Sequence, residues 1–331
     1  MATIKEIATL AGVSIATVSR VLNKDESMSV SAPTRERIFQ VADQLGYTRH
    51  KKNVLAYPHR KKIAIIQWYT QNEELNDLYY YSIRIGIERQ ALELGYDLVR
   101  IFHDHPLSDA HGVDGIIAIG KYSLHQIAIF ESISPHLVFV DSDTLNSGHT
   151  CITTDFQHAT RNVLDYFTQQ GQTDIGLLIG QEWTEDKSQP LLDPRFETFQ
   201  SYLTSKKLYK PEHVFIGQFT SDSGYQLMTQ ALKKSQLPQA FFIASDTMAI
   251  GALRALQEAG IQVPEQVSLI AFNDTAVAKQ VYPALSCVTV FTEEMGASAL
   301  TSLDAILSAD SPTIPRMIQL ATKLTLRGTS K

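Results

Sequence analysis

Several aromatic and polar residues stand where predicted strands end or predicted helices begin. They are Trp68, Tyr69, Tyr79, Tyr80, Asp141, Arg195, Asp246 and Asn273. Flat aromatic rings pack on the CH surfaces of sugars, and Asp, Asn and Arg side chains hydrogen-bond vicinal hydroxyls. These residue types suit a neutral sugar in a mostly apolar cleft. A purely structural role stays open for each of them, because aromatics near strand ends are often core residues and Asp246 is also placed to cap a helix.

A second set of chemically capable residues is His103, His105 and His111, interleaved with Asp104 and Asp109. These are metal-ligand types, but they lack the i, i+4 spacing of a helical site, so a polar loop is the preferred interpretation. The sequence has no G-x-G-x-x-G, P-loop, G-x-S-x-G or H-E-x-x-H motif. We therefore expect no enzyme activity, no metal and no cofactor.

Length and composition indicate a multidomain protein. At 331 residues the chain exceeds the size at which a single core stops growing. Cys151 and Cys287 are far apart and beside apolar residues, which favours small core residues over a disulfide or a metal site. No signal-peptide pattern or membrane-length apolar stretch occurs, so we expect a cytoplasmic protein without a membrane partner.

The candidate sugar-binding residues depend on short apolar runs for their positions. The first set of runs is 63–66, 98–101, 115–119 and 137–140, and the second set is 175–179, 214–216, 240–243 and 267–272. Runs that are buried on both faces suit parallel strands, and the helical stretches between them imply βαβ units. Two sets in series predict two similar α/β lobes.

The first 23 residues predict two short helices joined by a tight turn. Ile4, Ile7, Ala8 and Ala11 form an apolar stripe that Thr3 is placed to cap. Gly12 suits the turn, since glycine adopts positive φ without steric cost. Ser14 is a good N-cap for the second helix, whose inward side is Val18, Val21 and Leu22. This arrangement predicts a helix-turn-helix, whose second helix enters the DNA major groove.

A third helix is expected to begin at Pro33 and Thr34 and to end at Gly46. Its predicted buried stripe consists of Ile38, Phe39, Val41, Ala42 and Leu45. Residues 1–62 carry 11 Lys and Arg against 5 Asp and Glu, a net charge of +6, whereas the whole chain carries −6. A basic head on an acidic body favours DNA binding over an ordinary helical hairpin.

The sequence of this head resembles that of the LacI/GalR family of bacterial repressors. The matching segments are Ile4–Ala8, Ala11–Ser14, Ala16–Asn23 and the pair Gly46-Tyr47. The resemblance covers essentially the whole chain. In detail the chain is most similar to galactose and β-galactoside operon repressors, in the segments Asp77–Ser82, His103–Val113, Ser268–Asp274 and Lys323–Thr329.

The resemblance implies a domain organisation. It consists of a DNA-binding head (1–47), a basic hinge (48–62) and a two-lobed effector and dimerisation domain of the periplasmic-binding-protein type (63–331). We expect one lobe at about 63–153 and 291–316, and the other at about 154–288 and 317–331. The family places effector contacts at Asp141, Arg195 and Asn273, and Ser245 stands where it often has Asn. It often has Asp in place of Asn273, which leaves sugar selectivity open.

The expected DNA contacts lie on the second helix and the hinge. Arg20 is expected to bind guanine, Ile15 and Ala16 to make apolar contacts, and Ser14, Thr17 and Ser19 to hold phosphates. Asn23, Lys51 and Lys52 complete the set. In the family a hinge leucine wedges into the minor groove; that position is Ala56 here, so the neighbouring Leu55 is the candidate wedge.

The resemblance implies a homodimeric repressor of a sugar operon that binds palindromic operator DNA and leaves it when a sugar binds between the lobes. No leucine heptads follow Leu326, which favours a dimer over a tetramer. Two alternatives stay open. One is a regulator that uses a corepressor or another sugar, and the other is the solute-binding component of a sugar importer.

Overall fold

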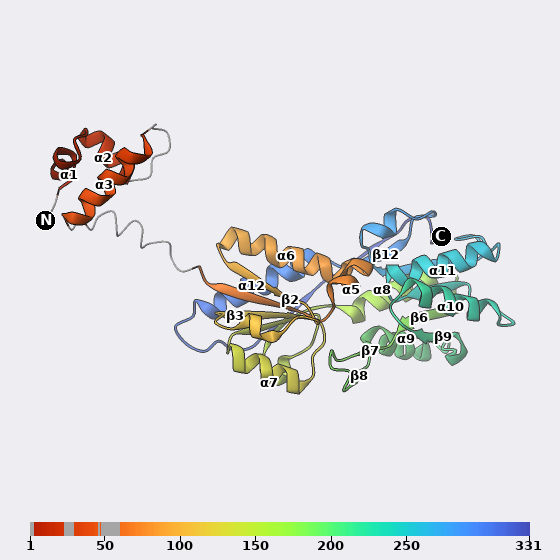
Figure 1. Ribbon diagram of the computed structural model, residues 1–331. Coiled ribbons are helices and arrows are strands. Elements are labelled where there is room, and N and C mark those ends of the chain that lie inside the picture. Colours follow the sequence, from red (N-terminus) through yellow and green to blue (C-terminus); the bar gives the residue numbers. More distant parts are fainter. Residues whose placement is uncertain (1–2, 23–29, 46, 48–59) are drawn as a thin grey trace. The chain divides into compact units, whose positions relative to one another are not determined.

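The computed structural model describes residues 3–22, 30–45, 47 and 60–331, and the chain forms two compact units, Met1–Arg60 and Lys61–Lys331 (Figure 1). The described helices of the first unit are α1 (Ile4–Ala11), α2 (Ile15–Leu22) and α3 (Ala32–Gln44). Thr3 and Glu6 form a capping box, and Gly12 ends α1 with a φ of 64°. Ser14 Oγ accepts a hydrogen bond of 3.0 Å from the backbone N–H of Thr17. The expected caps and turn are confirmed.

The three helices enclose a small core. Its buried members are Ile7, Ala8, Ala11, Val18, Val21, Leu22, Ile38, Ala42 and Tyr47. The predicted inward side of the second helix is therefore confirmed. Helix α3 begins at Ala32, one residue before the expected start at Pro33. Of its predicted stripe, Ile38 and Ala42 are buried, while Phe39, Val41 and Leu45 pack against the core at its edge.

The second unit contains two six-stranded sheets. The first has the order β13-β5-β4-β3-β1-β2, and all its strands are parallel. In that order the strands are Met317–Leu320, Thr150–Thr154, Leu137–Val140, Gly115–Ile119, Lys62–Gln67 and Asp97–Ile101. Helices α6 (Leu78–Leu94) and α12 (Thr292–Leu307) cover one face of this sheet, and α7 (Leu124–Ile133) covers the other. Short helix α5 (Gln71–Asn76) precedes α6.

The second sheet has the order β14-β12-β11-β10-β6-β9, with only β14 antiparallel. In that order the strands are Lys323–Thr325, Ser286–Thr289, Ser268–Asn273, Ala240–Ile243, Ile175–Gly180 and Val214–Gly217. Helices α8 (Phe156–Gln169) and α9 (Pro194–Ser205) cover one face, and α10 (Ser221–Leu232) and α11 (Asp246–Glu258) cover the other. Strands β7 (Glu182–Trp183) and β8 (Pro190–Leu191) form a separate hairpin.

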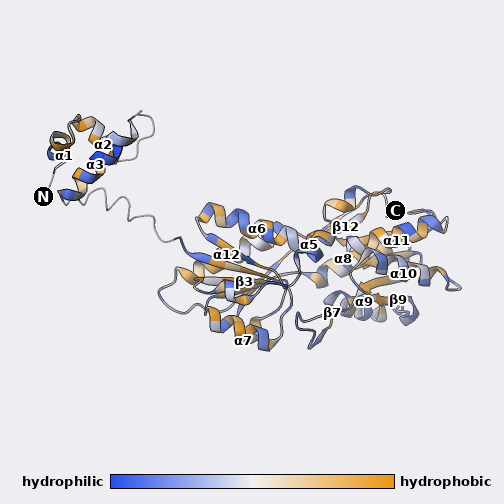
Figure 2. Cartoon of the chain, in the orientation of Figure 1, coloured by the Kyte–Doolittle hydropathy of each residue, from blue (hydrophilic) through white to orange (hydrophobic). Residues whose placement is uncertain are grey.

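Helix α12 lies beside α6 although the two are far apart in sequence (Figure 1). Glycines permit this close approach, because a Cβ built on Gly86 would lie 2.0 Å from the Glu293 carbonyl oxygen and one on Gly296 would lie 2.1 Å from that of Ile83. Helix α6 carries both hydrophobic and hydrophilic residues (Figure 2), and its buried residues include Tyr79, Ile83, Ile87 and Ala91.

The predicted fold class is confirmed, and the eight predicted apolar runs form parallel strands, with only Val267, the first residue of the last run, outside its strand. One lobe boundary was wrong. The segment expected to begin the second lobe at 317 instead forms β13, which pairs with β5 of the first sheet. The chain crosses to the second lobe at residues 321–322, before β14 pairs with β12. Within the described residues, no helix is long and apolar enough to cross a membrane.

Candidate effector cavity and nucleic-acid interface

A cavity of about 430 Å³, here called the interlobe cavity, lies between the two lobes. The first lobe contributes residues that follow strands β1, β3 and β4, and the second contributes the start of α9 and the ends of β10 and β11. Its polar and aromatic lining includes Tyr69, Asp77, Tyr79, Tyr80, Lys121, Asp141, Phe156, Glu182, Asp193, Arg195, Phe219, Ser245, Asn273 and Gln319. A ligand in this cavity would touch both lobes at once.

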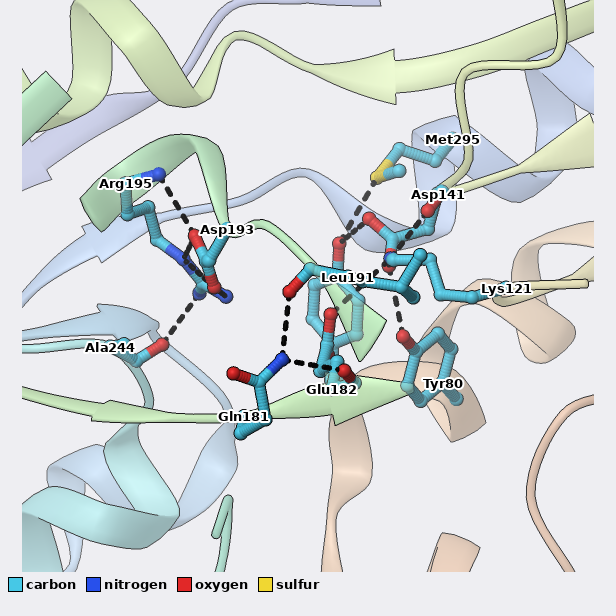
Figure 3. Close-up of polar contacts among 11 residues, drawn as sticks. Tyr80, Lys121, Asp141, Gln181, Glu182, Leu191, Asp193, Arg195, Ala244 and Met295 are labelled. Carbon is cyan, nitrogen blue, oxygen red and sulfur yellow. Dashed lines mark hydrogen bonds and ion pairs between the residues drawn. The ribbon is translucent and has the colours of Figure 1, made fainter. Parts of the chain in front are cut away.

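Asp141 is the centre of the first-lobe wall. It follows β4 in the left-handed conformation, with a φ of 64°, and its side chain is buried. Its Oδ1 accepts a hydrogen bond of 3.0 Å from the hydroxyl of Tyr79, and its Oδ2 accepts one of 2.9 Å from Tyr80. Lys121 Nζ lies 2.5 Å from the same Oδ2 (Figure 3). These donors fix the carboxylate and balance its charge.

Arg195 is the centre of the second-lobe wall. It sits in the first turn of α9, where Pro194 suits a helix start and Asp193 is the N-cap. Its Nε and Nη2 donate to the two carboxylate oxygens of Asp193 at 2.9 and 2.6 Å, and its Nη1 donates to the carbonyl of Ala244 at 2.6 Å (Figure 3). The guanidinium also lies 5.1 to 5.3 Å from the ring centroids of Phe156, Phe219 and Phe272.

The ionisable groups of the cavity have shifted pKa values. Burial raises the pKa of Asp77 to about 7 and also raises the pKa of Glu182. Burial opposes the charge of Lys121, but the carboxylates of Asp141 and Glu182 outweigh it and raise the Lys121 pKa. Burial likewise opposes the charge of Arg195, and the carboxylate of Asp193 raises the Arg195 pKa. Both cations are therefore held by carboxylates of the protein.

The β7–β8 hairpin (residues 182–191) reaches from the second lobe to the first. The backbone N–H of Glu185 donates to the carbonyl of Lys121 at 2.9 Å, and Ser123 Oγ donates to the carboxylate of Asp186 at 2.6 Å. The Glu185 carboxylate is also in close contact with His103 and Gln126. The hairpin thus links the lobes beside the cavity that its own residues help to line.

Most of the residues that the sequence nominated for the effector lie together in the interlobe cavity. These are Tyr69, Tyr79, Tyr80, Asp141, Arg195, Ser245 and Asn273. Trp68 instead lines a neighbouring cavity. Asp246 does not line either one: it is fully buried, and its carboxylate accepts from the backbone N–H groups of Thr247 and Thr275. The N-cap of α11 is Ser245 rather than Asp246, since Ser245 accepts from Met248.

Sequence reasoning missed Lys121, Glu182, Asp193 and Phe219. Lys121 could have been found by the same signal as Asp141, because it stands just after a predicted strand. Of the histidine cluster, His103 contacts Glu185, and no group of three metal-ligand side chains forms among the described residues. Cys151 and Cys287 are free thiols buried in the sheets, as expected; burial raises the pKa of each.

The second helix of the head exposes the side chains that were nominated for DNA. Ser14, Ile15, Ala16 and Arg20 are exposed, with 51% of Ile15 accessible. Thr17 and Ser19 are partly exposed. Ile15 therefore takes no part in the core of the head, whose members from this helix are Val18, Val21 and Leu22. Asn23, Lys51, Lys52 and Leu55 lie outside the described residues.

Comparison with known proteins identifies the family of the chain. The family model of the bacterial regulatory proteins, lacI family, matches residues 3–50, and that of the periplasmic binding protein-like domain matches residues 164–330. The HTH-type transcriptional regulator GalR of Streptococcus thermophilus is 51% identical, and GalR of Lacticaseibacillus casei is 40% identical, each over 100% of both chains. The solved lac repressor dimer bound to operator has a TM-score of 0.71 and 24% identity, over 99% of this chain and 98% of that chain.

The similarity to the lac repressor structure shows a shared fold. The family models and the two GalR relatives show the family. The matched head excludes the importer alternative, because it is the DNA-binding part of a bacterial regulator. The chain therefore belongs to the lacI family of bacterial regulatory proteins and is a DNA-binding transcriptional regulator rather than an enzyme.

Proposed function

We propose that this regulator represses a galactose or galactoside utilisation operon and leaves its operator when the sugar occupies the interlobe cavity. The observation that carries the proposal is that aromatic rings and hydrogen-bonding groups from both lobes line one cavity. Polar groups of this kind bind sugar hydroxyls, and aromatic rings pack on sugar CH faces. The relatives named GalR support galactose as the sugar class.

The charge of the cavity favours a neutral sugar over a sugar phosphate. Its acidic lining residues are Asp77, Asp141, Asp143, Glu182 and Asp193. Its two cations, Lys121 and Arg195, are each bonded to one of these carboxylates. A phosphate group would have to displace a carboxylate to reach either cation, and like charges within a cavity repel strongly.

Release from DNA requires that the sugar bind the DNA-free form more tightly. A ligand shifts a two-state equilibrium only by its differential affinity for the two states. A sugar that touches both lobes can supply that difference, because it favours the lobe arrangement in which both sets of contacts are made.

On DNA, we propose a homodimer whose two heads occupy successive major grooves of a palindromic operator, in the cytoplasm. Arg20 reads a base, Ile15 and Ala16 contribute apolar contacts, and Ser14, Thr17 and Ser19 contact phosphates. Asn23, the lysines at 51 and 52, and Leu55 complete the proposed interface.

Operator binding tests this function. Fluorescence anisotropy of labelled DNA from upstream of the gene, at fixed salt, is titrated with galactose, lactose and galactose 6-phosphate. Release by a neutral sugar and not by the phosphate is expected. Tighter binding with sugar would reassign the chain to the corepressor type, and no response to any of the three would contradict a galactose-type effector.

A further inference from the structure

A second cavity of about 650 Å³, here called the side cavity, adjoins the interlobe cavity. The two cavities share Tyr69, Asp77, Glu182 and Phe219 in their walls. The side cavity is also lined by Trp68, Glu73, His103, Gln181, Trp183, Thr184, Glu185, Lys187, Thr220, Ser221, Asp222 and Thr247. Because these four residues line both cavities, the two cavities lie directly side by side.

Two tryptophans distinguish the side cavity from the interlobe cavity. Trp183 lies on β7 of the hairpin, and 44% of its surface is exposed. Trp68 stacks on Tyr69, with ring centroids 5.3 Å apart and an angle of 26° between the planes. A large aromatic side chain left accessible at a cavity wall offers a flat apolar face, which is the surface that a pyranose ring covers.

The polar groups of the side cavity suit hydroxyl groups rather than anions. Thr220, Ser221 and Asp222 stand at the start of α10, and Thr247 stands in the first turn of α11. Hydroxyl and carboxylate oxygens accept hydrogen bonds from sugar hydroxyls. Among the described lining residues the basic side chains are Lys187, which is exposed, and His103, which contacts the Glu185 carboxylate. A phosphorylated ring would meet an acidic wall here as well.

We propose that the side cavity is a second sugar subsite, which binds the second ring of an unphosphorylated disaccharide whose first ring occupies the interlobe cavity. The inference rests on the proposed function, because it needs the first ring in the interlobe cavity. Trp183 is the platform for the second ring. The effector class is therefore a galactose-containing disaccharide rather than free galactose.

Calorimetric titration of the full chain with galactose, lactose and melibiose tests the subsite. At least one disaccharide is expected to bind about tenfold tighter than galactose. Trp183→Ala is expected to remove that gain, while the affinity for galactose changes by less than about twofold. Trp183→Tyr, which keeps a flat ring, is expected to restore most of the gain. Leu191→Ala is the matched control on the same hairpin. It lines the interlobe cavity, so it is expected to weaken galactose and disaccharide alike.

The outcomes separate the two proposals. Equal affinities for galactose and both disaccharides, or equal losses for both ligand classes in Trp183→Ala, would overturn the subsite and leave the proposed function standing. Binding of none of the three sugars would overturn both.

Discussion

Lys121 Nζ lies 2.5 Å from Asp141 Oδ2 and 4.0 Å from Glu182 Oε2. A single cation of the first lobe therefore stands between a carboxylate of its own lobe and a carboxylate of the other. The Lys121 side chain is only 17% exposed, so its charge is poorly solvated and depends on these partners. The Lys121 ammonium also fixes the orientation of the Asp141 carboxylate, which accepts hydrogen bonds from the hydroxyls of Tyr79 and Tyr80.

Removing this cation is expected to destabilise the two-lobed unit. Lys121→Met leaves the Asp141 carboxylate buried without its charge partner, and loss of one member of a buried pair costs about 3 kcal/mol. Asp141→Asn in the Lys121→Met background should recover part of that loss, because the uncompensated charge is then gone. Urea unfolding of the two single variants and the double variant measures the coupling. Strictly additive free energies would contradict the pairing, and Lys187→Met, at an exposed position, is the control.

Arg195 is expected to be needed for the sugar response but not for operator binding. Lysine keeps the charge at this position but cannot bond both oxygens of Asp193 and the Ala244 carbonyl together. Arg195→Lys should therefore raise the sugar concentration for half-release at least about tenfold, with sugar-free operator affinity within about twofold. The anisotropy titration reads both quantities. Equal loss of both would assign Arg195 a folding role, and Arg254→Lys, on the exposed surface, is the control.

The sequence predicted those strands that are continuous apolar runs. It missed β5 and β12 because their residues, Thr150–Thr154 and Ser286–Thr289, are mostly hydroxyl-bearing or thiol side chains. Both strands are nevertheless buried, because each lies inside its sheet. Their outer neighbours, β13 beside β5 and β14 beside β12, come from the C-terminal end of the chain. Each pairing joins residues at least 34 positions apart in the sequence, and no local pattern encodes it. The lobe boundary was misplaced at 317 for the same reason, because the pairing of β13 with β5 is also a long-range contact.

The sequence predicted those cavity residues that directly follow an apolar strand or that begin a helix. Asp141, Arg195 and Asn273 satisfy this rule and line the cavity. Glu182 belongs to the hairpin, whose two-residue strands give no periodic signal. Asp193 stands outside the hairpin as the N-cap of α9, directly before Pro194, so the signal of a helix start was present there and was assigned to Arg195 alone. Ser245 and Asp246 are both buried, and a shift of one residue in the helix start decided which of the two lines the cavity. Both are good capping types, so composition could not choose between them.

Stability is expected to fall as the pH rises toward neutrality, and Asp77 is one source. Its pKa is about 7 in the folded chain against an ordinary value of 3.8, so the folded state holds the proton more tightly than the unfolded state does. The stabilisation is complete below about pH 4 and is lost as the pH rises to about 7, at up to ~1.4 kcal/mol per pH unit. Asp77→Asn cannot ionise, and it keeps a side-chain oxygen for the backbone N–H of Tyr79.

Urea unfolding at a series of pH values checks this expectation. The free energy of unfolding of the unsubstituted protein should decline more steeply from pH 5 to pH 8 than that of Asp77→Asn. Parallel profiles would show that Asp77 ionises normally in the folded chain. Asp222→Asn, at an exposed carboxylate, should leave the slope unchanged.

Arg20 is expected to determine one base of the operator. It is exposed on α2, and an arginine on a recognition helix reads guanine through its O6 and N7 atoms. Arg20→Ala should cost about 1–3 kcal/mol on the preferred operator and should make all four bases nearly equivalent at one position. Anisotropy measurements on operators that differ at single positions test this. Arg37→Ala, an exposed residue of α3, should at most weaken all operators uniformly. An unchanged base preference in Arg20→Ala would contradict this assignment and would mean that another residue of the head contacts that base.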